Sequence, residues 1–340
     1  MPQKPVIHLV IPQLIQPLSD WQSHYQFSPL YHYLTRFLVN FEVVKTNNNG
    51  IDENLFFKIG GQDFDELPVA IYRSQIHFTE QQNTVGPMVC ADPVHLEVGL
   101  KDITLTHQID DLTIGEAKEL ILLLNDHLKQ DGFTFIFGTN KNWYLTLEDD
   151  GFKSSSLESV LGKSITNHLP TSNGRNWSVL QNEVQMILHN SPLNQQRELM
   201  GLPTINSLWF WGGGQPIPIP EKNIHIISDN EQRGKMIAKA SQGEWTDLTG
   251  LQNIDESLIE DTIIIAESLQ KSALANDVDL YQQSLSGLET EVVKPVFEAW
   301  SKGKIEVIID SCDGKIIKPI RNPSWKFWNK VPSNLLGVNE

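Results

Sequence analysis

The sequence predicts a mixed α/β protein: a doubly wound, largely parallel sheet that carries a smaller inserted α+β domain. In the second half of the chain, short apolar runs alternate with helical segments, the order typical of a parallel sheet covered by helices. Polar or turn-forming residues gather near Pro87, from Asp149 to Ser156 and from Pro170 to Gly174, and they bracket a stretch of strands and one helix. We therefore expect a core of residues 1–85 and 171–340 and an inserted lid domain of residues 86–170.

Charge and composition restrict the partners of the chain. Its 340 residues (38.5 kDa) carry 26 Lys and Arg against 42 Asp and Glu, a net charge of −16. Such a surface repels nucleic acid and anionic lipid, so we expect neither as a partner. No run approaches the roughly 18 apolar residues of a membrane span, and Cys90 and Cys312 lack a CxxC partner. We expect a cytoplasmic protein with reduced thiols and no cofactor.

The first 61 residues predict one strand and two helices. Val6–Ile11 is a short apolar run stopped by Pro12, which is typical of a buried strand. Ser28-Pro29 is a typical helix start, and the next apolar residues follow helical spacing. These residues are Leu30, Leu34, Phe37 and Leu38. Ile51–Ile59 predicts a second helix, which Gly60-Gly61 ends.

The inserted segment predicts extended stretches around Gly99, then one helix and two strands. Thr113 and Glu116 are spaced as a capping box, which marks the start of an amphipathic helix. Asp131-Gly132 ends this helix. The two strands are Phe133–Phe137 and Trp143–Leu147.

The rest of the chain predicts four more strands of the main sheet and several helices. Ser178 and Gln181 are spaced as a second capping box, and a short helix covers Leu193–Met200. The strands are Leu208–Trp211, Ile224–Ile227, Thr262–Ala266 and Ile305–Ile309, and the further helices are Asn230–Ala240 and Asp279–Trp300.

Two segments carry candidate ligand-binding residues. Gly212, Gly213 and Gly214 follow a predicted strand end, where their backbone amides could meet an anion, although the spacing matches no known phosphate loop. The alternative is a tight turn packed beneath tryptophans. His189 ends one helix, and Asn194 and Arg197 lie one turn apart on the next. Arg197 could bind a phosphate or carboxylate bidentately, or pair locally. The partner expected from these residues is a phosphorylated or carboxylate small metabolite.

Metal-ligand residue types are present but scattered. On a strand, His95 and Glu97 share one face while Asp92 points elsewhere, which makes half of a metal site. Asp229 and Asp313 are the remaining weak candidates. We expect these positions to be polar surface or structural residues, with no metal bound.

Several segments together resemble the archaeal-type, cofactor-independent phosphoglycerate mutases of the alkaline phosphatase superfamily. They are more similar still to the bacterial RpfE-type regulatory proteins. The segments, which cover about half of the chain, are Ala91–Leu96, Glu116–Leu147, His189–Arg197 with its H-x-x-P-x-N-x-x-R pattern, Asn206–Gly214 and Asp229–Gly243. The resemblance implies an alkaline-phosphatase-like doubly wound sheet with an inserted lid.

The resemblance also implies two divalent metals held by Asp and His around a Ser or Thr nucleophile, and these residues are missing. No histidine follows His225, and glycine follows Asp313 where the family has histidine. The first strand runs into Ile11-Pro12-Gln13 instead of Asp-Gly. The segment 51–60 offers Asn54 where the nucleophile would stand.

We therefore expect a catalytically degenerate phosphoglycerate-mutase-like protein with a regulatory or metabolite-binding role. One alternative is an active metal-dependent mutase or phosphatase with a rebuilt site. Another is a protein-interaction module that uses Trp-rich surfaces such as Trp325–Trp328. In the degenerate case, fewer than three Asp or His side chains should converge at the carboxyl-terminal edge of the strands, near Ile11, Asn54, Ala266–Gln270 and Asp313.

Overall fold

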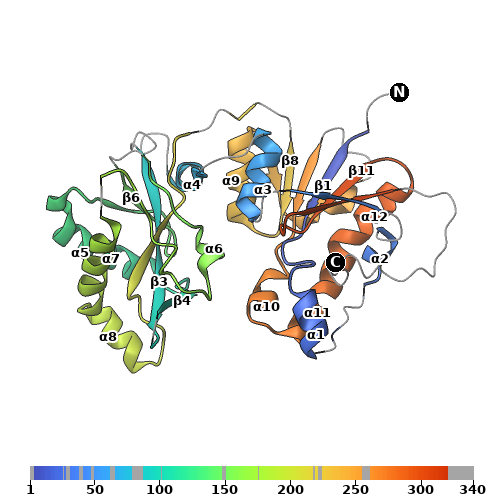
Figure 1. Cartoon of the computed structure of the whole chain (residues 1–340). Helices are drawn as coiled ribbons and strands as arrows, with labels where there is room; N and C mark the ends of the chain where they lie inside the picture. The colour runs from blue at the N-terminus through green and yellow to red at the C-terminus, as the bar shows by residue number, and fades with distance from the viewer. Residues whose placement is uncertain are drawn as a thin grey trace. The chain divides into compact units, whose positions relative to one another are not determined.

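The computed structural model describes residues 4–25, 27, 31–37, 41–46, 50–61, 66–78, 87–100, 102–147, 151–174, 176–216, 219–220, 224–254 and 261–320. It divides into a core unit, residues 1–62 and 219–340, and an insert unit, residues 63–218 (Figure 1). The insert unit extends beyond the expected 86–170 on both sides, because helix α4 (Val69–His77) packs against the long strand β3 (Met88–Val98) and β7 (Ser207–Trp211) pairs with it. The Trp325–Trp328 tail lies outside the described residues.

The core unit holds a seven-stranded sheet in the order β2-β12-β11-β1-β10-β8-β9. Five neighbouring strands, from β11 to β9, are parallel, and β12 and β2 add an antiparallel edge. The strands are β1 (Val6–Val10), β2 (Phe41–Lys45), β8 (His225–Ser228), β9 (Glu244–Thr246), β10 (Thr262–Ile265), β11 (Glu306–Asp310) and β12 (Lys315–Pro319). The chain is thus mixed α/β, as the alternation of apolar runs and helices predicts.

Helices flank this sheet. They are α1 (Leu18–Tyr25), α2 (Leu34–Phe37), α3 (Ile51–Gly60), α9 (Glu231–Ser241), α10 (Gln270–Leu274), α11 (Val278–Leu288) and α12 (Lys294–Ser301), with a 3-10 helix at Leu248–Asn253. A π-helical turn, Glu289–Val293, joins α11 directly to α12, so the helix expected over 279–300 is one continuous helical run that widens at this turn. The helix α3 ends where Gly61 takes φ 74°, as the Gly60-Gly61 pair predicts.

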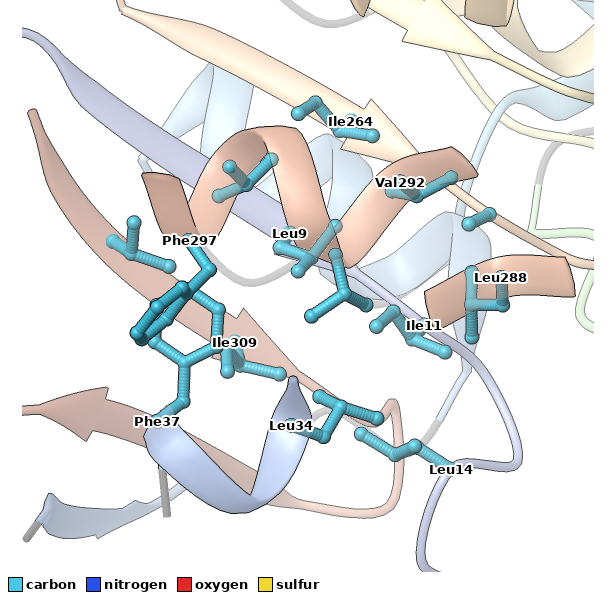
Figure 2. Close-up of a cluster of buried hydrophobic side chains, with 14 of the residues drawn as sticks. Leu9, Ile11, Leu14, Leu34, Phe37, Ile264, Leu288, Val292, Phe297 and Ile309 are labelled. Carbon is cyan, nitrogen blue, oxygen red and sulfur yellow. The ribbon is translucent and has the colours of Figure 1, made fainter. Parts of the chain in front are cut away.

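The core of this unit lies between the sheet and α2, α11 and α12 (Figure 2). Leu9 of β1, Ile264 of β10 and Ile309 of β11 are fully buried and belong to one apolar cluster with Val292 and Phe297. Burying each such side chain stabilises the fold by about 1.5–3 kcal/mol. Both faces of the central strands are covered, since Val10, the neighbour of Leu9, is fully buried as well.

The insert unit holds an antiparallel sheet in the order β4-β3-β6-β5, with β7 also paired to β3. Its remaining strands are β4 (Ile103–Gln108), β5 (Phe135–Phe137) and β6 (Trp143–Thr146). Residues 208–211 were expected in the main sheet. Their apolar pattern fits a buried strand of either sheet, so periodicity alone does not decide which one they join.

Besides α4, the helices of the insert unit are α5 (Ile114–Leu128), α6 (Leu157–Val160), α7 (Trp177–His189) and α8 (Pro192–Leu199), with a 3-10 turn at Lys129–Asp131. The helices α5 and α7 lie side by side and share a core with the sheet (Figure 1). The capping box of α5 is confirmed, with Glu116 N donating to Thr113 Oγ1 at 3.2 Å and Thr113 N donating to Glu116 Oε2 at 2.7 Å. None of the described helices is long and apolar enough to cross a bilayer.

The second predicted capping box does not form. Asn176 caps α7 instead, because its side-chain oxygen accepts the N–H groups of Ser178 and Val179. Gln181 is buried, and its Nε2 donates to Leu208 O at 3.0 Å. Gln181, which the spacing predicted as part of a helix cap, thus joins α7 to β7.

Candidate functional site

The carboxyl ends of the parallel strands meet at one edge of the core-unit sheet. The strands β8, β9 and β10 lie on one side of β1, whereas β11 lies on the other, so the direction of the chain connections reverses at β1. Ligands of open α/β sheets bind at such switch points, beyond the carboxyl ends of the strands. The residues that follow these ends include Asp229 after β8 and Glu267 after β10, while Asp310 ends β11. We call this region the strand edge.

Arg233 joins two carboxylates at the strand edge. It lies in the first turns of α9, directly after β8, and Asn230 caps that helix. Arg233 Nε donates to Asp52 Oδ1 of α3 at 2.9 Å, and its Nη1 lies 2.5 Å from Glu267 Oε2. Asn230 Nδ2 also donates to Glu267 Oε2, at 2.9 Å. One guanidinium therefore neutralises carboxylates from two elements that are far apart in sequence.

Asp229 accepts backbone donors at the same edge. Its two carboxylate oxygens lie 3.0 and 2.9 Å from Glu267 N. Burial raises the pKa of Asp229, and the negative charge of Glu267 adds to this rise, while the backbone N–H opposes it. Burial likewise raises the pKa of Glu53. The edge thus holds carboxylates whose ionised forms are disfavoured by burial.

A second buried cation, Lys58 of α3, pairs with Asp310. Lys58 Nζ lies 2.7 Å from Asp310 Oδ2, and the two side chains are 5% and 2% exposed. Asp310 Oδ1 accepts Cys312 N at 2.9 Å. Asp313, a predicted weak metal candidate, accepts from the hydroxyl of Ser311. Each of these acidic groups therefore has a donor within the protein.

No metal-binding cluster of three or more His, Cys, Asp or Glu side chains occurs within the described part of the chain. His225 lies at the opposite, amino end of β8, where its Nε2 is 3.0 Å from Thr246 Oγ1. Asn54, at the position of the family's nucleophile, is buried and donates to Gly50 O at 2.7 Å. The charges named at the edge are mostly carboxylates, with Arg233 and Lys58 as the cations.

Asp92, the first of the weak metal candidates, belongs to a buried network of the insert unit. Both of its oxygens accept from Arg73, at 2.8 Å each, and Trp211 Nε1 donates at 2.8 Å. Arg73 Nε also lies 3.3 Å from Tyr144 Oη, and Tyr144 Oη lies 2.6 Å from His77 Nδ1. Burial and the charge of Arg73 lower the pKa of His77 to about 4. Asp92 is thus the counter-ion of Arg73.

Asp92 does not lie on the same face of β3 as His95 and Glu97. Its side chain is fully buried, as the alternation of the strand predicts. Glu97 is exposed, whereas His95 is half-buried and lies opposite His107 of β4. His107 was missed because no local spacing indicates which residue of β4 pairs with His95. The register of the two strands supplies that information.

Asn194 and Arg197 are buried and bind the loop that follows α8. Arg197 Nε donates to Pro203 O at 2.8 Å, and its Nη2 lies 2.8 and 3.0 Å from the carboxylate oxygens of Asp111. Asn194 Nδ2 donates to Leu188 O and Ile205 O, both at 2.7 Å. His189 is exposed at the end of α7. The structure therefore places Asn194 and Arg197 close together, and the N–H groups named here bind acceptors of the protein itself.

The glycine run packs tightly inside the insert unit. Gly212 takes φ 65°, and its carbonyl accepts Ala70 N at 2.9 Å. A Cβ at Gly213 would lie 2.5 Å from Phe152 Cδ1, and Gly214 takes φ 147°. Positive φ at Gly212 and Gly214 favours glycine, and the space at Gly213 admits no side chain. These contacts agree with the packed-turn alternative.

No protein-family model matches the chain, and no curated protein matches it in sequence. Among solved structures, the PH0037 protein of Pyrococcus horikoshii is similar, with a TM-score of 0.50 and 11% identity over 93% of this chain and 88% of that chain. A cofactor-independent phosphoglycerate mutase of Thermoplasma acidophilum has a TM-score of 0.44 and 13% identity over 96% of this chain and 92% of that chain. The first similarity shows a shared fold, and the second is too low to assign one.

Proposed function

We propose that the chain is a catalytically degenerate phosphoglycerate-mutase-like protein with a regulatory role. The sequence segments that resemble the mutases and the RpfE-type proteins support this proposal, and they imply an alkaline-phosphatase-like core with the insert unit as its lid. The observation that carries the proposal is the pairing of strand-edge carboxylates with protein cations. Lys58 pairs with Asp310, and Arg233 pairs with Asp52 and Glu267.

A two-metal phosphoryl-transfer site needs carboxylate and imidazole groups that are free to coordinate. The metal ions activate the nucleophile and neutralise the phosphoryl charge. At this strand edge, a metal ion that used Asp310 or Glu267 as a ligand would compete with Lys58 or Arg233 for that carboxylate. Breaking one buried pair costs about 3–5 kcal/mol. Metal binding therefore competes with ion pairs that the folded chain already contains.

The same charges bear on the ligand of the proposed regulatory role. A phosphorylated or carboxylate metabolite needs donors that are free of protein acceptors, and Lys58 and Arg233 bind carboxylates instead. Carboxylates also outnumber cations among the edge residues named above, which disfavours an anion there. We therefore propose that such a metabolite binds through residues other than Lys58 and Arg233, or that the regulatory partner is a protein.

The experiment compares turnover and metal binding in the full chain. Purified protein is assayed with 3-phosphoglycerate and with p-nitrophenyl phosphate, with and without Mn²⁺, and Mn²⁺ binding is measured by calorimetry. We expect no turnover above background and no two-ion stoichiometry. The Asp310→Asn variant is the matched control, because it removes one edge carboxylate. Mn²⁺-dependent turnover that Asp310→Asn abolishes would overturn the proposal in favour of a rebuilt active site.

A further inference from the structure

Two histidines face each other across β3 and β4 of the insert unit. The register pairs His95 directly with His107, so the two side chains lie on the same face of the sheet. Their ring centroids are 6.1 Å apart, at an interplanar angle of 68°. His107 is exposed and His95 is half-buried. The pair is therefore close enough to share a small ligand and open enough to receive it.

The hydrogen bond of His95 fixes its tautomer. Its Nδ1 lies 2.7 Å from the carbonyl oxygen of Thr204, which can only accept. The proton is therefore on Nδ1, and the lone pair of the neutral ring is on Nε2. A histidine that ligates a metal usually donates its other ring N–H to a carbonyl or carboxylate in this way.

The hydrogen bonds of Thr106 favour the same tautomer for His107. The Thr106 hydroxyl donates to His95 O at 3.4 Å, so its oxygen is left to accept from His107 Nδ1, 3.0 Å away. The proton of His107 is then on Nδ1 as well. Both rings present Nε2 as a lone-pair donor.

A β-bulge holds the pair in place. The register shifts between His95 and Leu96, which leaves Thr106 as the extra residue of β4. On the other side of β3, where β7 pairs, the Asn206 side chain binds the next residue, because Leu96 N donates to its Oδ1 at 2.7 Å and its Nδ2 donates to Leu96 O at 2.8 Å. Bulges re-aim side chains and often lie next to functional sites. His95 is thus positioned by bonds on both sides of its own strand.

We propose that His95 and His107 bind one divalent transition-metal ion, such as Zn²⁺, Ni²⁺ or Cu²⁺, through their two Nε2 atoms. Imidazole suits these ions, and a metal–nitrogen distance of about 2.0–2.1 Å places the centroids of two bound rings roughly 5–6 Å apart. The observed centroid separation of 6.1 Å lies just outside this range. Because the described residues offer no third protein ligand there, water completes the coordination.

The test measures Zn²⁺ and Ni²⁺ binding to the full chain, without a histidine tag, by isothermal titration calorimetry at pH 7.5. We expect one tight ion per chain, with affinity lowered at least tenfold by His95→Gln and by His107→Gln. The matched control is His127→Gln, because His127 is also exposed and its Nδ1 also lies near a carbonyl, that of Leu123 at 2.9 Å. The ring contacts of histidines among the described residues do not include His127, so its loss should leave the affinity unchanged.

A second measurement separates ligand loss from misfolding. The variants should keep the circular dichroism spectrum of the parent protein, and the combined His95→Gln and His107→Gln variant should bind little more weakly than either single variant. Absence of a tight ion in the parent protein overturns the proposal. Affinities of both single variants within twofold of the parent, in folded protein, also overturn it.

Discussion

Arg73 of the insert unit and Arg233 of the core unit are both buried arginines with carboxylate partners, but their charges are balanced differently. Arg73 donates to one carboxylate, that of Asp92, through two bonds of 2.8 Å, and Asp92 also accepts from Trp211. Arg233 is shared between Asp52 and Glu267, at the edge of a parallel sheet. The Arg73 pair is neutral and enclosed, whereas the strand edge keeps an excess of carboxylates.

This difference indicates which of the two regions has a structural role and which lies where a ligand would bind. A neutral, enclosed pair leaves no charge for a ligand to satisfy, so its role is structural. A sheet edge with more carboxylates than cations lies where ligands of such sheets bind, and its cations are held by the protein itself. Removing single charges from each region tests whether the two roles are separate.

The largest effect is expected for Arg73→Met. This substitution leaves Asp92 fully buried without its counter-ion, which should lower the free energy of unfolding by about 3–5 kcal/mol. Urea titration followed by circular dichroism measures the change. A second substitution, Asp92→Leu, removes the unpaired charge and should restore most of the lost free energy of unfolding. A loss below about 1 kcal/mol for Arg73→Met would contradict the enclosed ion pair.

Lys58→Met should cost somewhat less, about 2–4 kcal/mol, because Asp310 keeps the N–H of Cys312 as a donor. The control is Lys271→Met on α10, where Lys271 is exposed and the change should stay within about 0.5 kcal/mol. The same urea titration compares the two variants. Equal effects of Lys58→Met and Lys271→Met would show that Lys58 does not neutralise the strand edge.

His77 predicts a pH dependence of stability that arises in the insert unit. Burial and the charge of Arg73 disfavour the charged ring and lower the pKa of His77 from its ordinary value of 6.5 to about 4 in the folded protein. Between these values the unfolded chain binds the proton and the folded chain does not. The stabilisation is therefore complete above pH 6.5 and is lost as the pH falls towards 4.

We expect this effect to change the free energy of unfolding by about 1–2 kcal/mol. This is less than the full pKa difference implies, because His77 is partly exposed and solvent screens its charge. Urea titrations of the parent protein and of His77→Gln at pH 7.5, 5.5 and 4.5 measure it. The difference in unfolding free energy between the two proteins should shrink as the pH falls. A difference that stays constant over this range would contradict the shifted pKa.

Local patterns predict the elements of this fold well, whereas the partners of distant residues escape them. The box of Thr113 and Glu116 is a local signal, and so is the helix end at Gly61. Residues 208–211 were recognised as a strand but expected in the wrong sheet, because pairing with β3 depends on residues more than a hundred positions away.

The candidate site shows the same limit. Asp313 was recognised beside a missing histidine, but the nearby Asp310 pairs with Lys58, which lies 252 positions earlier in the chain. His95 was recognised as half of a metal site, and the other histidine, His107, is identified by strand register. The identity of charge partners therefore requires the tertiary structure, even where the residue types are evident from the sequence.

The smallest effect is expected for Asp111→Asn, which removes the carboxylate bound to Arg197. Asp111 is 47% exposed, so the ion pair is screened and its loss should cost less than about 1 kcal/mol. The same variant tests whether Arg197 binds an anion, because it leaves the guanidinium without its charged partner. If Arg197 receives a phosphate or carboxylate, Asp111→Asn should raise the affinity for inorganic phosphate severalfold in calorimetry. An unchanged affinity, with Pro203 O still bound to Nε, would leave Arg197 as a residue that fastens the loop after α8.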